Sequence, residues 1–391
     1  MNKAIRFAGM VCAVAMGGST AFAHTVGGQP ALDIDAVIAS EVYTPRTTFR
    51  NQSGGETVFY GQINPAWQYF DDGEQTTDGL VDNGNWNTRL GFRITQPLTD
   101  GTLRFRFETG LGLRNSALIS QDFRPDWVNW QRTSLRWFEV AYDGSFGTIS
   151  AGQGSSASDG TAGMDESFTF QAGATDTSDG FGSFRFRDST GALTDITVGA
   201  VNDSFDGARR FRLRYDTPSF AGVTFSTSYG RNVLVSQDKR HYYDIAVRWS
   251  GDVGDFALQA AAGYGWEDNP DGLNQKRAAG SFTVFHTPTG LNWAVSAGSR
   301  MNGADYYYTR AGWRTDFTEF GTTSLSVDYY HGSDFVTKGS RTQNYGIYGV
   351  QSFDAFSLDL YAGWRRLSYR DTTGISYQDA DAILIGARWF F

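Results

Sequence analysis

The sequence predicts an all-β fold, a transmembrane antiparallel β-barrel of sixteen strands, on the basis of three observations. Apolar and polar residues alternate with period two from about residue 57 to the end of the chain. Short turns and long polar connections alternate along the same span. The final stretch, AILIGARWFF, would place Ile383, Ile385, Ala387, Trp389 and Phe391 on one face of a closing strand. A long meander of this kind is typical of a barrel that turns its apolar face toward lipid.

The chain begins with a segment that predicts export. Lys3 and Arg6 precede an apolar run over residues 7–16, and the cleavage pattern Ala-Phe-Ala follows at 21–23. Such a three-part segment, here residues 1–23, is typical of a secretory signal peptide and is too short for a membrane anchor. Its removal would take away two basic residues and no acid, so the mature chain would be even more acidic than the net charge of −9. An acidic exported chain argues against nucleic acid as a partner.

Residues 24–56 form an N-terminal extension before the first predicted strand. Its centre could be helical, and the segment could stay in the periplasm or enter the barrel as a plug. The one cysteine, Cys12, lies in the predicted signal, so the mature chain would have neither disulfides nor thiol chemistry. The barrel is predicted over residues 57–391.

The strands are predicted in two groups on either side of a long loop. Five are centred near residues 64, 90, 107, 137 and 150, and eleven near 212, 226, 246, 260, 281, 294, 310, 326, 347, 361 and 386. Segments 183–188 and 194–200 could form another pair and make eighteen strands. We favour sixteen, with both segments inside a loop over residues 154–208. Within residues 135–142 the apolar phase changes, and a β-bulge would reconcile the two halves.

The identity of the inner face separates three interpretations of this pattern. A soluble β-sandwich would bury the apolar face and leave the charged face in water, and a secreted multi-domain β-protein would show linkers. Sixteen strands in one meander exceed what a sandwich usually holds, and strands of about ten residues match the tilted span of an outer membrane. Aromatic residues near strand ends, among them Tyr60, Tyr229 and Trp266, would form interfacial girdles. The barrel with a polar, water-filled lumen is therefore the better interpretation.

Two stretches of the chain carry a resemblance to a known family. They are FYGQINPAWQYFDDG (59–73) and EVAYDGSFGTISAGQGSSASDG (139–160). The first resembles the opening strand, and the second the segment before the third loop, of the sixteen-stranded trimeric general porins of Gram-negative outer membranes. The resemblance extends from residue 57 to Phe391, and it implies that Phe391 is the assembly signal.

The same resemblance implies a function and a setting. The protein would be an outer-membrane channel for passive diffusion of small hydrophilic solutes and ions, surrounded by outer-membrane lipid and assembled as a homotrimer. The long third loop, residues 154–208, would fold into the lumen and narrow it. A solute-specific channel of the same architecture is the alternative, and a secreted soluble β-protein is a more distant one.

Arginines recur on the polar face of the strands that flank the long loop. In RRFRLRYDTPSFAGVTFSTSYG (209–230), for example, three arginines alternate with Phe211, Leu213 and Tyr215. In a barrel such arginines would point inward and form a positively charged arc, because guanidinium stays ionised even when crowded. The predicted basic wall consists of Arg89, Arg93, Arg104, Arg106, Arg132, Arg136, Arg210, Arg212 and Arg214.

The long loop is rich in acids that could face this arc across the lumen. Opposed charges at a constriction are a usual means of tuning a pore. The candidate acids are Asp159, Asp165, Glu166, Asp176 and Asp179, of which Asp165 and Glu166 are preferred. Single arginines could instead only pair with neighbouring carboxylates such as Glu108 or Asp216.

The sequence carries no pattern that indicates catalysis or a bound cofactor. The four histidines, His24, His241, His286 and His331, are scattered and lack the Ser–His pair with an orienting group that hydrolysis requires. There is no Cys/His metal spacing, no phosphate-binding glycine motif before a helix, and no EF-hand pattern for calcium. We therefore expect neither an enzyme nor a cofactor or metal site.

Overall fold

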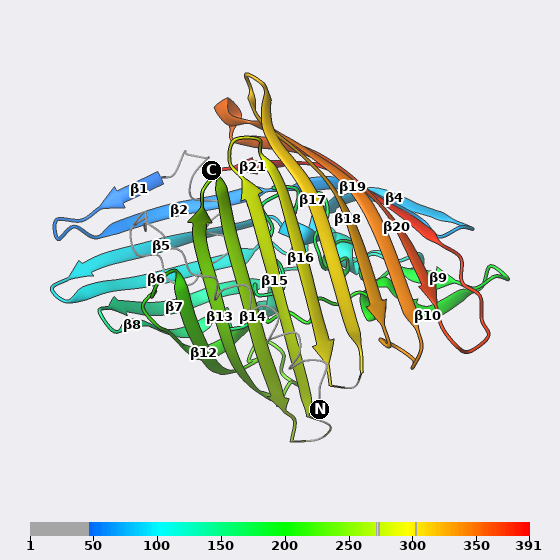
Figure 1. The fold of residues 1–391 in the computed structure, drawn as a ribbon, viewed down its shortest axis with the longest axis horizontal. Helices are drawn as coiled ribbons and strands as arrows, with labels where there is room; N and C mark the ends of the chain where they lie inside the picture. The colour runs from blue at the N-terminus through cyan, green and yellow to red at the C-terminus, as the bar shows by residue number, and fades with distance from the viewer. Residues whose placement is uncertain (1–46, 271, 273, 302) are drawn as a thin grey trace.

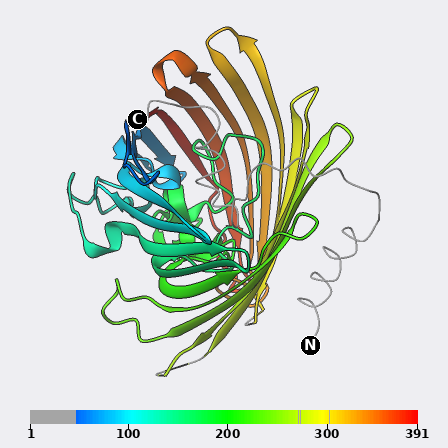
Figure 2. The same ribbon diagram turned by 90° about the vertical axis from the view of Figure 1, so that its left-hand side faces the viewer.

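Sixteen antiparallel strands close into a barrel in the part of the chain that the structure describes (Figures 1 and 2). The structure is a computed structural model that describes residues 47–391 except 271, 273 and 302. The predicted signal and residues 24–46 of the predicted extension lie outside the described residues. The predictions of an all-β barrel and of sixteen strands are confirmed.

The first two barrel strands are each built from two pieces. The first consists of β2 (Glu56–Ile63) and β3 (Pro65–Asp71), and the second of β4 (Thr76–Asp82) and β5 (Arg89–Leu98), interrupted by the 3-10 helix η1 (Gly84–Trp86). β2 pairs with β5, while β3 pairs with β4. The polar stretch over residues 71–84 is therefore not one long connection, because β4 within it extends the second strand toward the long-loop end.

The other strands follow in chain order, each hydrogen-bonded to the next. They are β6 (Gly101–Gly110), β7 (Leu135–Gly144), β8 (Gly147–Ser155), β11 (Arg209–Asp216), β12 (Val223–Arg231), β13 (His241–Val253), β14 (Phe256–Asp268), β15 (Gln275–His286), β16 (Leu291–Arg300), β17 (Asp305–Thr318), β18 (Gly321–Ser333), β19 (Arg341–Phe353), β20 (Leu358–Arg370) and β21 (Ala380–Phe390). β21 then pairs with β3 and with the end of β2, which closes the ring. Figure 1 shows β13 to β20 side by side in one tilted wall.

Burial alternates along the strands and identifies the inner face. In β19 the side chains of Asn344 and Tyr348 are buried, whereas those of Tyr345 and Ile347 are exposed, Ile347 by 59%. The same alternation in β11 buries arginines and exposes large apolar residues. An apolar outer surface around a polar interior is the reverse of a soluble sandwich and matches a transmembrane barrel.

A β-bulge joins β6 and β7. Glu108 lies opposite Trp137, but the next residue, Thr109, lies opposite Leu135, so Arg136 is the extra residue. Trp137 faces inward and is 5% exposed, while Phe138 lies on the outer face at 51%. The predicted bulge is confirmed.

The connection from β8 to β11, residues 156–208, carries elements of its own. They are the short helices α3 (Ser178–Phe181) and α4 (Val198–Val201) and the strands β9 (Arg185–Arg187) and β10 (Leu193–Thr197). β9 and β10 form a separate two-stranded sheet, so segments 183–188 and 194–200 do not join the barrel. The remaining 3-10 helices are η2 (Ser116–Leu118), η3 (Arg132–Ser134) and η4 (Asp354–Phe356). Among the described residues, no helix has both the length and the apolar character needed to cross a membrane.

A short strand, β1 (Thr47–Arg50), extends the sheet beside the C-terminus. It pairs with residues 56–59 of β2, whereas β21 pairs with β2 only at Gln62 and Ile63. The C-terminal Phe391 lies between these two contacts, and its backbone exchanges two hydrogen bonds with Gly61, of 2.9 and 3.1 Å. The Phe391 ring covers Gly61 so closely that a Cβ there would meet the ring at 2.5 Å.

Candidate functional site: a charged cavity inside the barrel

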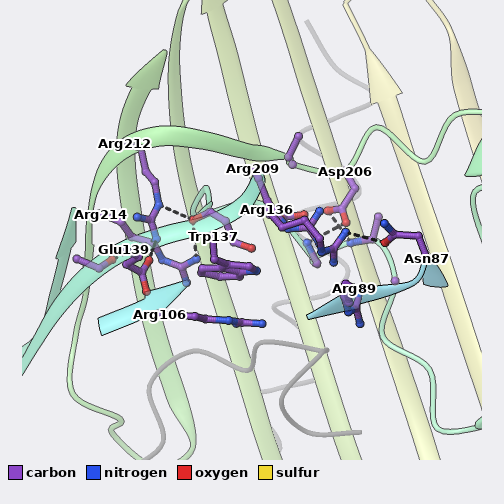
Figure 3. A pocket seen from close by; sticks show the side chains of 18 of the residues that line it. Asn87, Arg89, Arg106, Arg136, Trp137, Glu139, Asp206, Arg209, Arg212 and Arg214 are labelled. Carbon is purple, nitrogen blue, oxygen red and sulfur yellow. Dashed lines mark hydrogen bonds and ion pairs between the residues drawn. The ribbon is translucent and has the colours of Figure 1, made fainter. Parts of the chain in front are cut away.

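A cavity of about 620 Å³ lies between the inner wall of β5 to β8 and β11 and residues of the 156–208 loop (Figure 3). Nine arginines and seven acids line it, counted over the described residues. The arginines are Arg89, Arg93, Arg104, Arg106, Arg136, Arg209, Arg212, Arg214 and Arg248. The acids are Glu139, Asp159, Asp176, Asp179, Asp203, Asp206 and Asp216.

The register of the sheet explains why the arginines form an arc. Arg93 on β5 lies directly opposite Arg106 on β6, and Arg106 lies opposite Glu139 on β7. On β8, Gly152 lies between Glu139 and Arg212 of β11. A single row of cross-strand neighbours thus carries three arginines and one acid on the inner face. Like charges directly opposite each other are unfavourable, so this row needs compensation from nearby groups.

Much of that compensation comes from one buried carboxylate, Glu108. Its side chain is 1% exposed and lies 2.8 Å from Arg106 Nη2, 2.5 Å from Arg136 Nε and 3.8 Å from Arg89 Nε. The Tyr60 hydroxyl donates to Glu108 Oε2 at 2.8 Å and accepts from Arg106 Nε at 3.1 Å. Three guanidinium groups around one carboxylate leave this part of the wall positively charged. The expectation that Tyr60 belongs to an outer aromatic girdle is wrong, because its hydroxyl is held by these inward charges.

Other wall arginines pair one to one with acids. Arg214, for example, donates from both Nε and Nη2 to the Asp216 carboxylate, at 2.8–3.1 Å. For these arginines the alternative interpretation holds, in which an arginine pairs with a neighbouring carboxylate of the barrel wall. The pairs are Arg104–Asp143, Arg212–Glu139 and Arg214–Asp216.

Two predicted wall arginines lie apart from the cavity. Arg132 is exposed in η3, because β7 begins only at Leu135, and its predicted place on the wall is wrong. Arg210 faces inward but packs over the ring of Tyr242, with its Cζ 4.2 Å from the ring centroid. The cavity is instead lined by two arginines that were not predicted, Arg209 and Arg248.

These two arginines differ in how far the sequence could have revealed them. Arg248 alternates with Val247 and Trp249, so its inward direction was readable from the pattern. It donates to the backbone carbonyl oxygens of Ala157 and Asp159 in the loop, at 2.9 and 2.8 Å. Arg209 is the first residue of β11, and a strand boundary carries no such signal.

The two preferred acids lie against the opposite wall. Asp165 is 2.7 Å from Arg310 Nη1, and Glu166 is 3.4 Å from Arg314 Nη1. Both arginines belong to β17, the twelfth strand of the ring, whereas β7 in the arginine arc is the fourth. The prediction that these acids face the arc is wrong, because β17 has inward arginines of its own that bind them.

The remaining predicted acids do line the cavity. Asp159, Asp176 and Asp179 reach it from the loop, together with Asp203 and Asp206, which were not singled out from the sequence. Burial and the neighbouring carboxylate of Asp159 raise the pKa of Asp206 to about 7. Burial and the carboxylate of Asp203 raise the pKa of Asp176 to about 6. Burial and the carboxylate of Asp176 likewise raise the pKa of Asp179 to about 8. Part of the acidic lining is therefore protonated near neutral pH.

A buried ion network fixes the loop to β17–β20. Asp328 on β18 accepts from Arg310 Nη2 at 3.0 Å and from Arg365 Nη2 at 2.5 Å. Arg310 also donates to the loop carbonyl oxygen of Gly173, and Arg365 to that of Ala174 at 3.0 Å. The charged side chains of this network are nearly inaccessible to solvent. These contacts hold the loop on one side and leave the cavity on the arginine side.

The described histidines form no catalytic arrangement. His241 bonds to the Tyr229 hydroxyl and His286 to the Thr289 hydroxyl, each at 2.7 Å. His331 Nε2 lies 3.3 Å from the Ser333 hydroxyl. Among the described residues, no three acids, histidines or cysteines gather closely enough to hold a metal ion.

Comparison with known proteins finds one matching family and several solved structures with a similar fold. A Gram-negative porin family model matches residues 39–372. The anion-selective porin from Comamonas acidovorans superposes with a TM-score of 0.58 at 16% identity, over 86% of this chain and 100% of that chain. OmpF of Salmonella typhi in complex with daunomycin superposes with a TM-score of 0.53 at 13% identity, over 88% of this chain and 100% of that chain. OprB of Pseudomonas putida superposes with a TM-score of 0.55 at 10% identity, over 86% of this chain and 94% of that chain. No curated protein sequence matches the chain.

At such identities the structural likenesses establish the fold, whereas the family match spans most of the chain. Family and fold both point to a channel rather than an enzyme. The chain belongs to the Gram-negative porin family and is an outer-membrane β-barrel that forms a channel for passive diffusion of solutes.

Proposed function

We propose that this porin prefers anions and that the charged cavity is its selective constriction. The observation that carries the proposal is the surplus of guanidinium groups, nine against seven acids over the described lining, with three arginines sharing the buried Glu108. Partial protonation of Asp179 and Asp206 near neutral pH would enlarge this surplus. A structural relative, the porin from Comamonas acidovorans, is anion-selective.

The 156–208 loop would define the width of this constriction. In our proposal it folds into the lumen, and its acids Asp159, Asp176 and Asp179 face the arginine wall while the wall arginines supply the larger charge. Rings and clusters of charge at a narrow point control which solutes enter a pore. The acidic net charge of the chain is a weaker guide to selectivity, because it includes surface residues far from the cavity.

The sign of the reversal potential tests the proposal directly. Purified protein in a planar bilayer under a KCl gradient is expected to give a reversal potential shifted toward the chloride equilibrium potential. A shift toward the potassium potential would overturn the anion preference. Large ohmic steps would agree with a general porin, whereas a small conductance blocked by one solute would favour a solute-specific channel.

A homotrimer is part of the proposal and draws on an aromatic band on the outer face. Five phenylalanine rings follow one another across five neighbouring strands, and the centroids of successive rings are 5.5–6.0 Å apart. They are Phe49, Phe59, Phe92, Phe105 and Phe138. Such a band would pack against other subunits, while lipid covers the rest of the outer face. A trimer form of OmpT from Vibrio cholerae is a structural relative at a TM-score of 0.53 and 16% identity, over 86% of this chain and 99% of that chain. Unheated detergent gels are expected to show a trimer in the wild type and smaller species in Phe105→Arg.

Export by a cleaved signal completes the proposal. Removal of residues 1–23 would leave His24 as the first residue of the mature chain. N-terminal sequencing of protein isolated from outer membranes tests this, and a mature chain that still begins with Met1 would contradict it.

A further inference from the structure

Arg93 differs from the other arginines that line the cavity. Among the described residues, its guanidinium group makes no ion pair and no hydrogen bond, and its contact is the face of Tyr60, with Cζ 5.0 Å from the ring centroid. The other eight arginines have partners of their own. The side chain is half-buried and reaches the cavity.

The ring beneath Arg93 is itself held in place. The Tyr60 hydroxyl donates to Glu108 and accepts from Arg106, as described above. Arg106 also lies over the same ring at 5.9 Å and over the ring of Trp137 at 4.0 Å. Two hydrogen bonds and two neighbouring cations therefore fix Tyr60, and a cation–π contact with a fixed ring holds Arg93 at the cavity wall.

The contact with Tyr60 uses the charge of Arg93 but none of its N–H donors. A guanidinium group carries five such donors in a planar fork, and this fork matches two oxygens of a carboxylate or phosphate. Arg106, directly opposite on the next strand, adds a second positive charge beside it. A halide can use this positive potential, but only an oxyanion can also use the geometry of the fork.

We propose that Arg93, positioned by Tyr60, is the residue at which the channel contacts oxyanionic solutes, namely carboxylates and phosphates, and thereby discriminates among anions. This inference rests on the proposed anion preference. The other wall arginines supply potential and close the wall, because each has a partner of its own within the protein.

Block of chloride current by oxyanions tests the inference. Inorganic phosphate or acetate is added to KCl in planar-bilayer recordings, and the half-blocking concentration is measured. Arg93→Lys keeps the charge but loses the fork, and Arg93→Gln loses both. Both variants are expected to raise the half-blocking concentration about tenfold, as loss of a charge-assisted bidentate contact predicts. Arg93→Lys is expected to keep the chloride-to-potassium permeability ratio of the wild type.

A matched control uses an arginine on the outer face of β20. Arg366 pairs with Asp381 at 2.6 Å, and Arg366→Lys and Arg366→Gln are expected to leave the block unchanged. Heat-modifiable migration on gels checks that each variant folds. Unchanged block in both Arg93 variants would overturn the inference, and so would block by only one of the two probes. A wild-type channel that prefers cations would instead overturn the proposed anion preference. The reversal potential in KCl alone shows this, without any added oxyanion.

Discussion

At the scale of the residue, the arginine wall depends on a few buried carboxylates. Glu108 is the clearest case, because three guanidinium groups converge on it and Tyr60 donates to it as well. Removal of one partner from a buried ion cluster leaves uncompensated charge, which is much more costly than loss of an exposed pair.

Glu108→Gln is therefore expected to destabilise the folded barrel by about 3–5 kcal/mol, the typical cost of breaking a buried ion pair. The measurement is the urea or temperature dependence of the folded form on unheated gels. Glu56→Gln, which removes the exposed partner of Arg50, is the matched control and is expected to change stability by less than about 1 kcal/mol. Equal effects of the two substitutions would contradict the role given to Glu108.

Three loop acids give the cavity a pH dependence whose sign can be stated. The pKa values of Asp176, Asp206 and Asp179 are raised to about 6, about 7 and about 8, so these carboxylates lose negative charge as pH falls from 8 to 5. The cavity becomes more positive, and anion preference is expected to increase over that range. Reversal potentials at each pH measure the effect, and the triple variant Asp176→Asn, Asp179→Asn and Asp206→Asn should abolish most of it. A rising cation preference at low pH would be inconsistent with this lining.

At the scale of the element, period-two alternation predicted the strands because each has one lipid-facing and one lumen-facing side. The pattern also predicted a bulge within residues 135–142, and the structure has it at Arg136. It did not reveal the interruption by η1, where Asn83 caps a 3-10 turn with its side chain. It also misplaced Asp165, because the partner of this loop residue is Arg310, 145 positions later in the chain. Loop paths are set by such distant contacts, which no local pattern encodes.

The network around Asp328 is expected to control the loop as a unit. Asp328→Asn removes the charge that Arg310 and Arg365 share, so the loop should loosen and the lumen should widen on that side. We expect higher single-channel conductance and more open-channel noise than in the wild type. Asp354→Asn in η4, at the short-turn end, is the control and should leave both unchanged. Identical recordings from the two variants would show that the network does not restrain the loop.

At the scale of the whole molecule, closure of the ring places the C-terminus against the first strand. Phe391 was expected to matter for assembly by family resemblance alone, and the structure adds its packing on Gly61. Phe391→Ala is expected to lower the fraction of chain that reaches the heat-modifiable folded form in outer membranes. Gly61→Val, which would place a side chain into the same ring, should have a similar effect. Normal yields of both variants would argue against this contact as a step in closure.

The short strand β1 covers an edge of the sheet that would otherwise be open to another polypeptide chain. Without it, residues 56–59 of β2 would present a row of unpaired amide and carbonyl groups beyond the end of β21. An exposed strand edge is a template on which a foreign polypeptide can add as a further strand. Because Thr47–Arg50 already pair with residues 56–59, this part of the edge is closed to the addition of a strand from another polypeptide.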